Sequence, residues 1–319
     1  MKKVAWLFIS LFLAASVFAV GSRQGGGGEK YPTKQIRMIV QANPGGGSDI
    51  NCRTIAPGVE AILGVPVVPE NRPGGGGAVA FSYGATQPAD GYTISHVAVD
   101  LAILKPTNTA DVSPEQFNMI CRVAYMGAGI AVRADSKYRN LNDFIADAKA
   151  RPGEIMIGNS GLNTLWHLSG VQFENAVGIK MSHVPFEGVG PCATALLGGH
   201  IDALVAAPPE VASQVLGEQF RLLAVFYDER LPLFPDAPTL KELGIDLTCL
   251  NYMGFGVPRG TPRDVINTLA DAFKKSYDSD VYQEMLKSRG FTPGWMGPEE
   301  FDKFIQADYE KYLKLIPTL

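Results

Sequence analysis

The stretch Ile36-Arg37-Met38-Ile39-Val40, followed closely by Pro44-Gly45-Gly46-Gly47-Ser48-Asp49, decides the fold. The first five residues form a nearly continuous apolar run, which is typical of a buried strand in a sheet covered on both faces. The glycines allow a tight turn, and the residues after Ser48 have a helical pattern. A buried strand, a glycine-rich loop and a helix in this order predict a βα unit.

Further apolar runs repeat this alternation along the chain. Each is short and nearly continuous, as expected for buried strands of a parallel sheet. They cover residues 92–99, 155–158, 181–184, 201–205 and 222–226. The alternation predicts an open α/β fold, and 319 residues exceed the roughly 150 of one typical domain, so we expect two such units, with one large α/β domain as the alternative.

Two helices near the C-terminus have clear start signals. Thr261 as N-cap, with Pro262 in the first turn and Asp264 three residues after the cap, predicts one helix start. Pro298 predicts the start of the second helix. The apolar stripe of that helix consists of Phe301, Phe304, Ile305, Tyr309, Tyr312, Leu313 and Ile316.

The composition excludes some classes of protein. With 46% hydrophobic and 19% charged residues, the chain is neither disordered nor fibrous. The 28 basic and 32 acidic residues give a formal charge of −4, and no basic cluster stands out. Nucleic acid is therefore excluded as an expected partner, because binding to its phosphates needs such a cluster.

The N-terminus predicts export. Lys2 and Lys3 precede an apolar run over residues 4–20, and Val17-Phe18-Ala19 fits a signal-peptidase site. We expect residues 1–19 to be a signal peptide cleaved after Ala19, and the glycine-rich residues 20–30 to form a tether. An uncleaved membrane anchor is the alternative. The expected location is the periplasm.

Metal and catalytic motifs are absent from the sequence. The histidines, His96, His167, His183 and His200, follow no HExxH pattern, and Ser160 does not lie in a GxSxG motif. The cysteines are far apart and form no CxxC pair, so buried thiols or one or two disulfides are expected: Cys52, Cys121, Cys192 and Cys249. We predict no catalytic residue, no metal site and no cofactor.

Two glycine-containing loops at predicted helix starts are the candidate binding elements. Gly45, Gly46, Gly47 and Ser48 would point N–H groups at an anion such as a carboxylate, helped by the helix dipole. The stretch 159–164 would do the same after a second strand. The alternative is that the glycines only form tight turns. Asp49 could contact the ligand or merely complement the helix dipole.

The order of several motifs resembles one family. The motifs are Tyr31-Pro32-Thr33-Lys34-Gln35-Ile36-Arg37, Pro44-Gly45-Gly46-Gly47-Ser48-Asp49, Glu70-Asn71-Arg72-Pro73-Gly74-Gly75-Gly76-Gly77, Asp90-Gly91-Tyr92-Thr93, Asn159-Ser160-Gly161, His183 to Pro191, Leu196 to Asp202, Pro235 to Thr239 and Gly256 to Pro262. From about Tyr31 to the C-terminus, the chain resembles the periplasmic solute receptors of tripartite tricarboxylate transporters, the Bug or TctC-like family.

This resemblance implies an α/β fold of the type II periplasmic-binding-protein kind, with two lobes that are each an open mixed sheet flanked by helices. The implied lobes are residues 31–126 plus 258–319, and residues 127–257. It also implies a monomeric receptor that binds a small organic acid between the lobes. The implied partners are the membrane subunits of a tripartite tricarboxylate-type transporter.

The family resemblance also implies a set of ligand-binding positions. From the first loop these are Gly45, Gly46, Gly47, Ser48 and Asp49. The opposing loop would contribute Ser160, Gly161, Asn163 and Thr164, with Phe186, Gly188 and Asp202 as supporting or lining residues. We expect the backbone of Gly46 and Gly47 and the hydroxyls of Ser48 and Thr164 to hold the carboxylate.

Some positions depart from the usual family residues. Glu187 and Val189 would make the pocket rim more acidic and less hydrated, and Asn163 occupies a position often held by glycine. Leu165 and Trp166 replace smaller polar residues, so we expect a ligand with an apolar portion. The alternatives to a transport receptor are a solute-sensing receptor for a signalling system and a secreted hydrolase.

Overall fold

The computed structural model describes residues 31–318 of the 319-residue chain. The predicted signal peptide, residues 1–19, and the predicted tether, residues 20–30, lie outside the described residues. Within the described part, no helix has the length and apolar character needed to cross a membrane.

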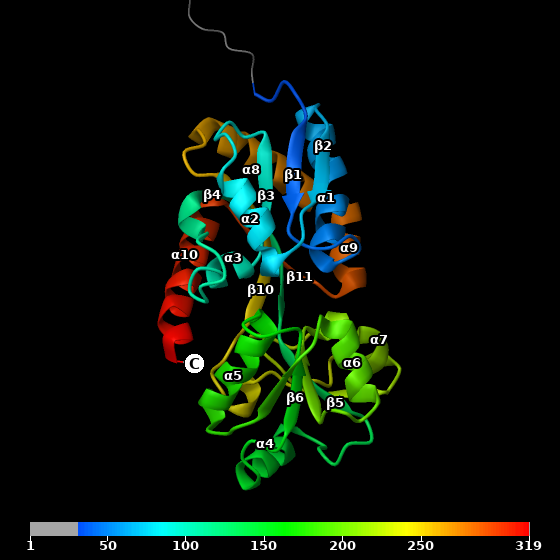
Figure 1. Cartoon of the computed structure of the whole chain (residues 1–319). Helices are drawn as coiled ribbons and strands as arrows, with labels where there is room; N and C mark the ends of the chain where they lie inside the picture. The colour runs from blue at the N-terminus through cyan, green and yellow to red at the C-terminus, as the bar shows by residue number, and fades with distance from the viewer. Residues whose placement is uncertain (1–30, 319) are drawn as a thin grey trace, which may run out of the picture.

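The chain forms two lobes, one above the other in Figure 1, and each lobe is built on its own sheet. The first sheet has six strands in the order β11-β4-β10-β3-β1-β2. They are β1 (Ile36–Val40), β2 (Val67–Asn71), β3 (Thr93–Val97), β4 (Phe117–Gly127), β10 (Leu250–Pro258) and β11 (Thr292–Met296). β1 runs parallel to β2 and β3, whereas β10 runs antiparallel to β3 and β4, so the sheet is mixed.

The second sheet has five strands in the order β7-β6-β8-β5-β9. They are β5 (Gly129–Arg133), β6 (Met156–Asn159), β7 (Ser182–Pro185), β8 (Ala203–Ala206) and β9 (Phe220–Val225). β6 is parallel to β7 and β8, whereas β5 is antiparallel to β8 and β9. The carboxyl ends of β6, β7 and β8 therefore lie at one edge of this sheet.

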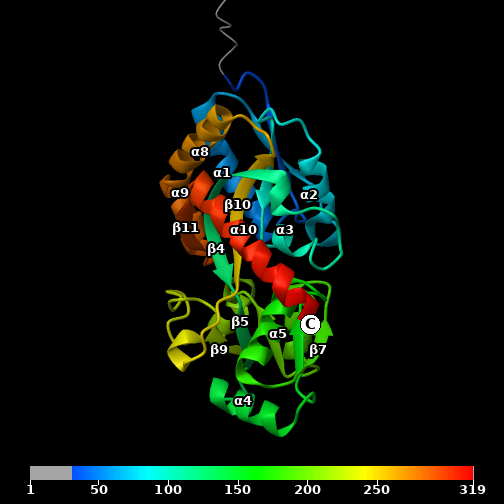
Figure 2. The ribbon, with the colours of Figure 1, turned by 90° about the vertical axis from the view of Figure 1, so that its left-hand side faces the viewer.

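Helices flank both sheets. They are α1 (Gly47–Leu63), α2 (Ala78–Ala85), α3 (Asp100–Ile103), α4 (Leu141–Ala150), α5 (Leu165–Val177), α6 (Val189–Leu197), α7 (Ala212–Leu216), α8 (Arg263–Tyr277), α9 (Asp280–Arg289) and α10 (Pro298–Leu315). A short 3-10 turn, η3 (Pro208–Val211), follows β8. α10 starts in the first lobe and ends beside α5 of the second lobe (Figure 2).

The chain passes between the lobes twice, from β4 to β5 and from β9 to β10. The two crossings touch, because the Ala128 N–H donates to the Cys249 carbonyl at 3.0 Å. We expected the second lobe to end at residue 257, but β10 pairs with β4 along residues 250–258 and so belongs to the first sheet. The pairing moves this boundary to about residue 249.

The six predicted strands are present as β1, β3, β6, β7, β8 and β9, with small shifts at their ends. The expectation of parallel pairing is wrong for β9, which pairs antiparallel with β5. Thr261 is not the N-cap of α8: Pro262 is, and the Thr261 hydroxyl donates to the Pro258 carbonyl at 2.7 Å. α10 starts at Pro298 as predicted, although Leu313 of its stripe is 44% exposed.

The four cysteines are buried and free, so the structure favours buried thiols over disulfides. Cys121 and Cys249 lie in the large hydrophobic core, and Cys192 lies in a smaller one under α6. Burial raises the pKa of each thiol well above its usual value. A neutral thiol is a small apolar side chain, which suits these positions.

Candidate functional site

The loop between β1 and α1 contains three glycines with different requirements. Gly45 has φ +82°, a left-handed conformation that favours glycine. Gly46 has φ −72°, which any residue can adopt, although a Cβ there would lie a tight 3.2 Å from the Asn43 carbonyl oxygen. A Cβ at Gly47 would meet the side chains of Met253 and Phe291 at 3.5 Å, an ordinary contact. The loop conformation therefore demands glycine only at Gly45.

The buried side chain of Asp49 stabilises this loop by accepting hydrogen bonds. The side chain is only 4% exposed. The carboxylate accepts hydrogen bonds from the Gly45 N–H at 2.9 Å, from Arg53 Nε at 2.9 Å and from Asn71 Nδ2 at 2.8 Å. Burial raises the pKa of Asp49, but these donors outweigh it and hold the pKa below its usual value. The geometry therefore favours a supporting role for Asp49 over the predicted ligand contact.

Ser48 lies at the start of α1 with its hydroxyl in contact with Gln41. Gln41 Nε2 donates to Ser48 Oγ at 3.1 Å, and Gln41 Oε1 lies 2.9 Å from His96 Nδ1. A Cβ at Gly77 would lie 3.5 Å from Gln41 Cβ, so the loop of Gly74–Gly77 packs beside Gln41. The glycine-rich loops Gly45–Asp49 and Gly74–Gly77 therefore both lie close to Gln41.

The second predicted loop connects β6 to α5. Asn163 has φ +60°, which confirms the expectation that asparagine can take the place of glycine here. The Thr164 hydroxyl donates to the Gly161 carbonyl at 2.8 Å, and Ser160 Oγ lies 3.4 Å from Thr164 Oγ1. The Thr164 proton is used inside the loop, so the prediction of Thr164 as a donor to the ligand does not fit this geometry.

Phe186 and Gly188 follow β7 at the same edge of the second sheet. The Phe186 N–H donates to the Asn159 carbonyl at 3.0 Å, and Gly188 precedes α6 with φ +110°. Asp202 lies elsewhere, because its carboxylate accepts from the Met156 N–H at 2.9 Å at the amino end of β6. That is the opposite end of the strand from Ser160, so the structure does not bring Asp202 together with the other predicted site residues of this lobe.

A pocket of about 240 Å³ lies between the lobes at the start of α1. The first lobe contributes Ala42, Gly47, Ser48, Ile50, Met126, Asn251, Arg289 and Phe291, and the second contributes Pro209 and Glu210. Among the predicted site residues, Gly47 and Ser48 line this pocket. The loop of Ser160 does not line this pocket, so the two predicted loops do not share it.

Arg289 is a pocket residue that sequence reasoning missed. It is the last residue of α9, its side chain is exposed, and no ion pair or hydrogen bond of its guanidinium occurs within residues 31–318. Gly290 follows it, and a Cβ there would lie 3.3 Å from Pro209 Cγ of the second lobe. The end of α9 therefore lies at the boundary between the lobes with an unpaired cation.

Glu210 lines the same pocket from the second lobe. Its carboxylate accepts hydrogen bonds from the Ala207 N–H at 3.0 Å and from the Trp166 side chain. Trp166 is 6% exposed and Leu165 is 4% exposed, and neither lines the pocket. Their side chains are part of the core, which corrects the expectation that they accommodate an apolar portion of the ligand.

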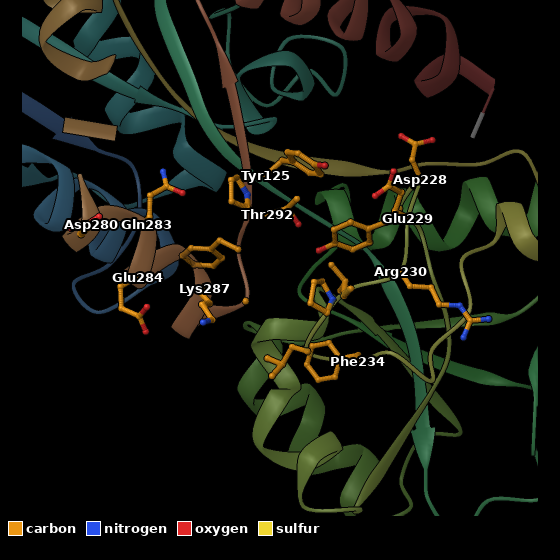
Figure 3. Close-up of a pocket in the computed structure, with 17 residues that line it drawn as sticks. Tyr125, Asp228, Glu229, Arg230, Phe234, Asp280, Gln283, Glu284, Lys287 and Thr292 are labelled. Atoms are coloured by element: carbon orange, nitrogen blue, oxygen red, sulfur yellow. The ribbon is translucent and has the colours of Figure 1, made fainter. Parts of the chain in front are cut away.

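A larger pocket, of about 1010 Å³, lies between α9 and β11 on one side and residues 227–234 on the other (Figure 3). Aromatic rings lie on its wall, from Tyr125, Tyr227, Phe234 and Phe291. Its charged residues are mostly acidic: Asp228, Glu229, Asp280 and Glu284, against Arg230 and Lys287. Arg230 already pairs with Glu242 at 2.9 Å. This pocket contains no predicted site residue.

Two sheets in separate lobes, two chain crossings and a pocket between the lobes define a two-lobe solute-binding protein of the α/β class. The sequence model of the family described as "Tripartite tricarboxylate transporter family receptor", TctC, matches residues 51–319. The chain belongs to this family. Its members are receptors that bind a solute and not enzymes, as the motif order predicts.

Known proteins of similar sequence and structure agree with this assignment. A UPF0065 protein encoded in the gbd 5′ region of Cupriavidus necator is 34% identical over 292 residues, which cover 91% of this chain and 89% of that protein. A TctC solute-binding protein from Polaromonas has a TM-score of 0.80 at 31% identity, covering 91% of this chain and 100% of that chain. The R. palustris protein Rpa4515 with adipate has a TM-score of 0.79 at 27% identity, covering 90% and 98%.

Proposed function

We propose that this protein is an extracytoplasmic receptor that holds a small organic acid by a carboxylate in the pocket beside Ser48. The observation that carries the proposal is the set of unused donors at that pocket. Gly46 has no side chain to cap α1, which leaves the first N–H groups of the helix for a ligand. Ser48, which has a hydroxyl, and Arg289, whose guanidinium is unpaired within the described residues, line the same pocket. A helix start and a cation together favour an anion.

The size of the pocket and a relative's ligand support a small acid. Pockets for drug-sized ligands measure roughly 300–1000 Å³, so about 240 Å³ suits a smaller molecule. Rpa4515, which has a similar fold at 27% identity, was solved with adipate, a dicarboxylate. We therefore propose a carboxylate ligand with a short carbon chain.

The charge of the larger pocket argues against a carboxylate ligand there. Four acidic residues line it, of which Asp228 pairs with Lys241 at 3.5 Å, and one of its two basic residues, Arg230, is already paired with Glu242. An added carboxylate would be repelled by this acidic lining. The pocket of Ser48 contains one acidic residue, Glu210, whose carboxylate already accepts two hydrogen bonds.

We propose that the lobes close over the ligand. The loop of Ser160 and Thr164 follows β6, at the sheet edge that also leads through β8 to Pro209 and Glu210. This edge faces the first lobe, so a rotation at the two crossings would bring the loop toward Ser48. A ligand that contacts both lobes would then shift the equilibrium toward the closed form.

The family assignment supports a role in transport. We propose that the mature protein is a periplasmic monomer that delivers its ligand to the membrane subunits of a tripartite tricarboxylate-type transporter. A receptor that reports the solute to a signalling system is the alternative. Deletion of the gene separates the two: loss of ligand uptake indicates transport, whereas normal uptake with loss of a transcriptional response indicates sensing.

A carboxylate screen tests the proposed binding site. Mono-, di- and tricarboxylates, including adipate, should give a narrow set of hits in a thermal-shift assay, because a ligand that binds only the folded state stabilises it. At a hundredfold excess over the Kd this stabilisation is about 2.7 kcal/mol. Ser48→Ala should weaken the best hit by about 1 to 2 kcal/mol, roughly 5- to 30-fold in Kd. Unchanged affinity in this variant would contradict the proposed site.

A further inference from the structure

Behind Ser48, polar side chains lead from the core of the first lobe to the pocket. His96 on β3 is only 1% exposed. Its Nδ1 lies 2.9 Å from Gln41 Oε1, and Gln41 Nε2 lies 3.1 Å from Ser48 Oγ. Ser48 in turn lines the pocket. Gln41 therefore connects a buried imidazole to the hydroxyl of a residue that lines the proposed binding pocket.

The surroundings of His96 assign the position of its proton. Burial lowers the pKa of His96 to about 3, so the ring is neutral at physiological pH and has a single N–H. His96 Nε2 is buried and has no hydrogen-bond partner within residues 31–318, whereas Nδ1 faces Gln41. A buried N–H without an acceptor is rarer than a buried unpaired acceptor. We therefore assign the proton to Nδ1.

This assignment fixes the orientation of Gln41. If Nδ1 is the donor, Gln41 presents its carbonyl oxygen to His96 and its amide nitrogen to Ser48. The amide is thus oriented by a hydrogen bond at each end, to His96 Nδ1 at 2.9 Å and to Ser48 Oγ at 3.1 Å.

We infer that His96 and Gln41 are positioning residues that direct the hydroxyl proton of Ser48 into the pocket. Ser48 Oγ accepts from Gln41 and has one proton of its own to donate. No acceptor for that proton occurs among the described residues, so a carboxylate in the pocket can take it. The inference rests on the proposed function, because it explains how Ser48 presents a donor to an anion.

The tautomer of His96 tests the inference without any ligand. Two-bond ¹H–¹⁵N correlation spectra of the ¹⁵N-labelled protein distinguish a proton on Nδ1 from one on Nε2. We expect His96 to be neutral at pH 7 with the proton on Nδ1. A proton on Nε2 would reverse the donor and acceptor roles in the hydrogen bonds of Gln41 with His96 and with Ser48. This result would overturn the inference.

A double-mutant cycle with adipate tests whether Gln41 acts through Ser48. Gln41→Met keeps the length of the side chain without its hydrogen bonds. We expect it to raise the Kd about 3- to 10-fold in the wild-type background but less than about twofold in Ser48→Ala, because coupled residues give non-additive effects. Equal factors in both backgrounds, or a wild-type Kd for Gln41→Met alone, would overturn the inference.

Gln87→Met is the matched control. Gln87 accepts from Arg37 Nη2 at 3.0 Å and donates to the Tyr83 carbonyl at 3.1 Å, and it lines neither of the two pockets described above. We expect its Kd to stay within about twofold of wild type. If the wild-type protein binds no carboxylate, the proposed function fails, whereas the His96 tautomer still decides the inference.

A charged variant covers the case in which Gln41→Met unfolds. Gln41→Glu keeps an acceptor for His96 Nδ1, so the buried hydrogen bond remains. Its carboxylate would accept the Ser48 proton and turn it away from the ligand. We expect the Kd for adipate to rise at least about tenfold, and unchanged binding would overturn the inference.

Discussion

Replacing Asp49 by Asn removes the charge that holds the loop of Gly45–Asp49 but keeps the shape of the side chain. The Asp49 carboxylate accepts from the Gly45 N–H, Arg53 and Asn71 at 2.8–2.9 Å. A hydrogen bond to a charged group contributes about 1.5–3 kcal/mol. Arg53 is 50% exposed, so its share is below about 1 kcal/mol. Because Asn can still accept one bond, we expect the free energy of unfolding to fall by about 2–4 kcal/mol at pH 7.

Urea unfolding measures this loss, and Asp264→Asn is the matched control. Asp264 lies in the first turn of α8 with an exposed side chain, so its carboxylate only complements the helix dipole. That interaction contributes about 0.3–1 kcal/mol. If Asp49→Asn costs no more than Asp264→Asn, the buried carboxylate does not hold the loop and the account of the first loop is refuted.

The pH dependence gives the same prediction a second test. Folding lowers the pKa of Asp49, so its contribution is present above the unfolded pKa of about 3.9 and is lost as the pH falls through the folded value. The difference in unfolding free energy between wild type and Asp49→Asn should therefore shrink below about pH 4. A difference that stays constant down to pH 2 would contradict the lowered pKa.

Further predictions concern the loop and the pocket. Gly45→Ala should lower the free energy of unfolding by about 1–2 kcal/mol, because φ is +82° there. Gly47→Ala should change it by less than about 0.5 kcal/mol. Urea unfolding of the two variants measures both values. Arg289→Gln should raise the Kd for adipate about 5- to 30-fold in calorimetry, with unchanged stability. Arg230→Gln, in the larger pocket, should leave the Kd for adipate unchanged. Equal losses of affinity in Arg289→Gln and Arg230→Gln would indicate only a long-range effect of charge.

Among the strands of the first sheet, apolar runs predicted β1 and β3, whereas β2, β4, β10 and β11 were not predicted. β1 and β3 are buried runs and were found, whereas β10 contains Gly254 and Gly256 and reads like a loop. The structure explains one of these glycines: a Cβ at Gly254 would lie 2.3 Å from the Phe301 ring of α10. The small residue follows from packing between segments far apart in the sequence.

The sequence identified residues of the candidate pocket only where they belong to one continuous motif. Gly47 and Ser48 follow a strand and begin a helix, and both line the pocket. Arg289 and Glu210 enter the pocket from distant segments, and no local pattern marks them. Asp202 was grouped with the site residues because its motif does not show which end of a strand will face the other lobe.

The sequence also could not show which way the side chains in the first turn of α5 point. Leu165 and Trp166 follow the second loop directly, which suggested a place in the pocket wall. Both are buried in the core, and Trp166 reaches the pocket only by its hydrogen bond to Glu210. Burial depends on the packing of α5 against the second sheet, which the sequence of the loop does not contain.

A crystal structure of the complex with adipate, or with the best acid of the screen, tests the central claim most directly. The account predicts a carboxylate at the start of α1, within hydrogen-bond distance of the Ser48 hydroxyl and the N–H of Gly47 or Ser48, with Arg289 turned toward the ligand. A ligand found in the larger pocket beside Asp228 and Glu229, or one between the lobes that leaves Ser48 untouched, would contradict it.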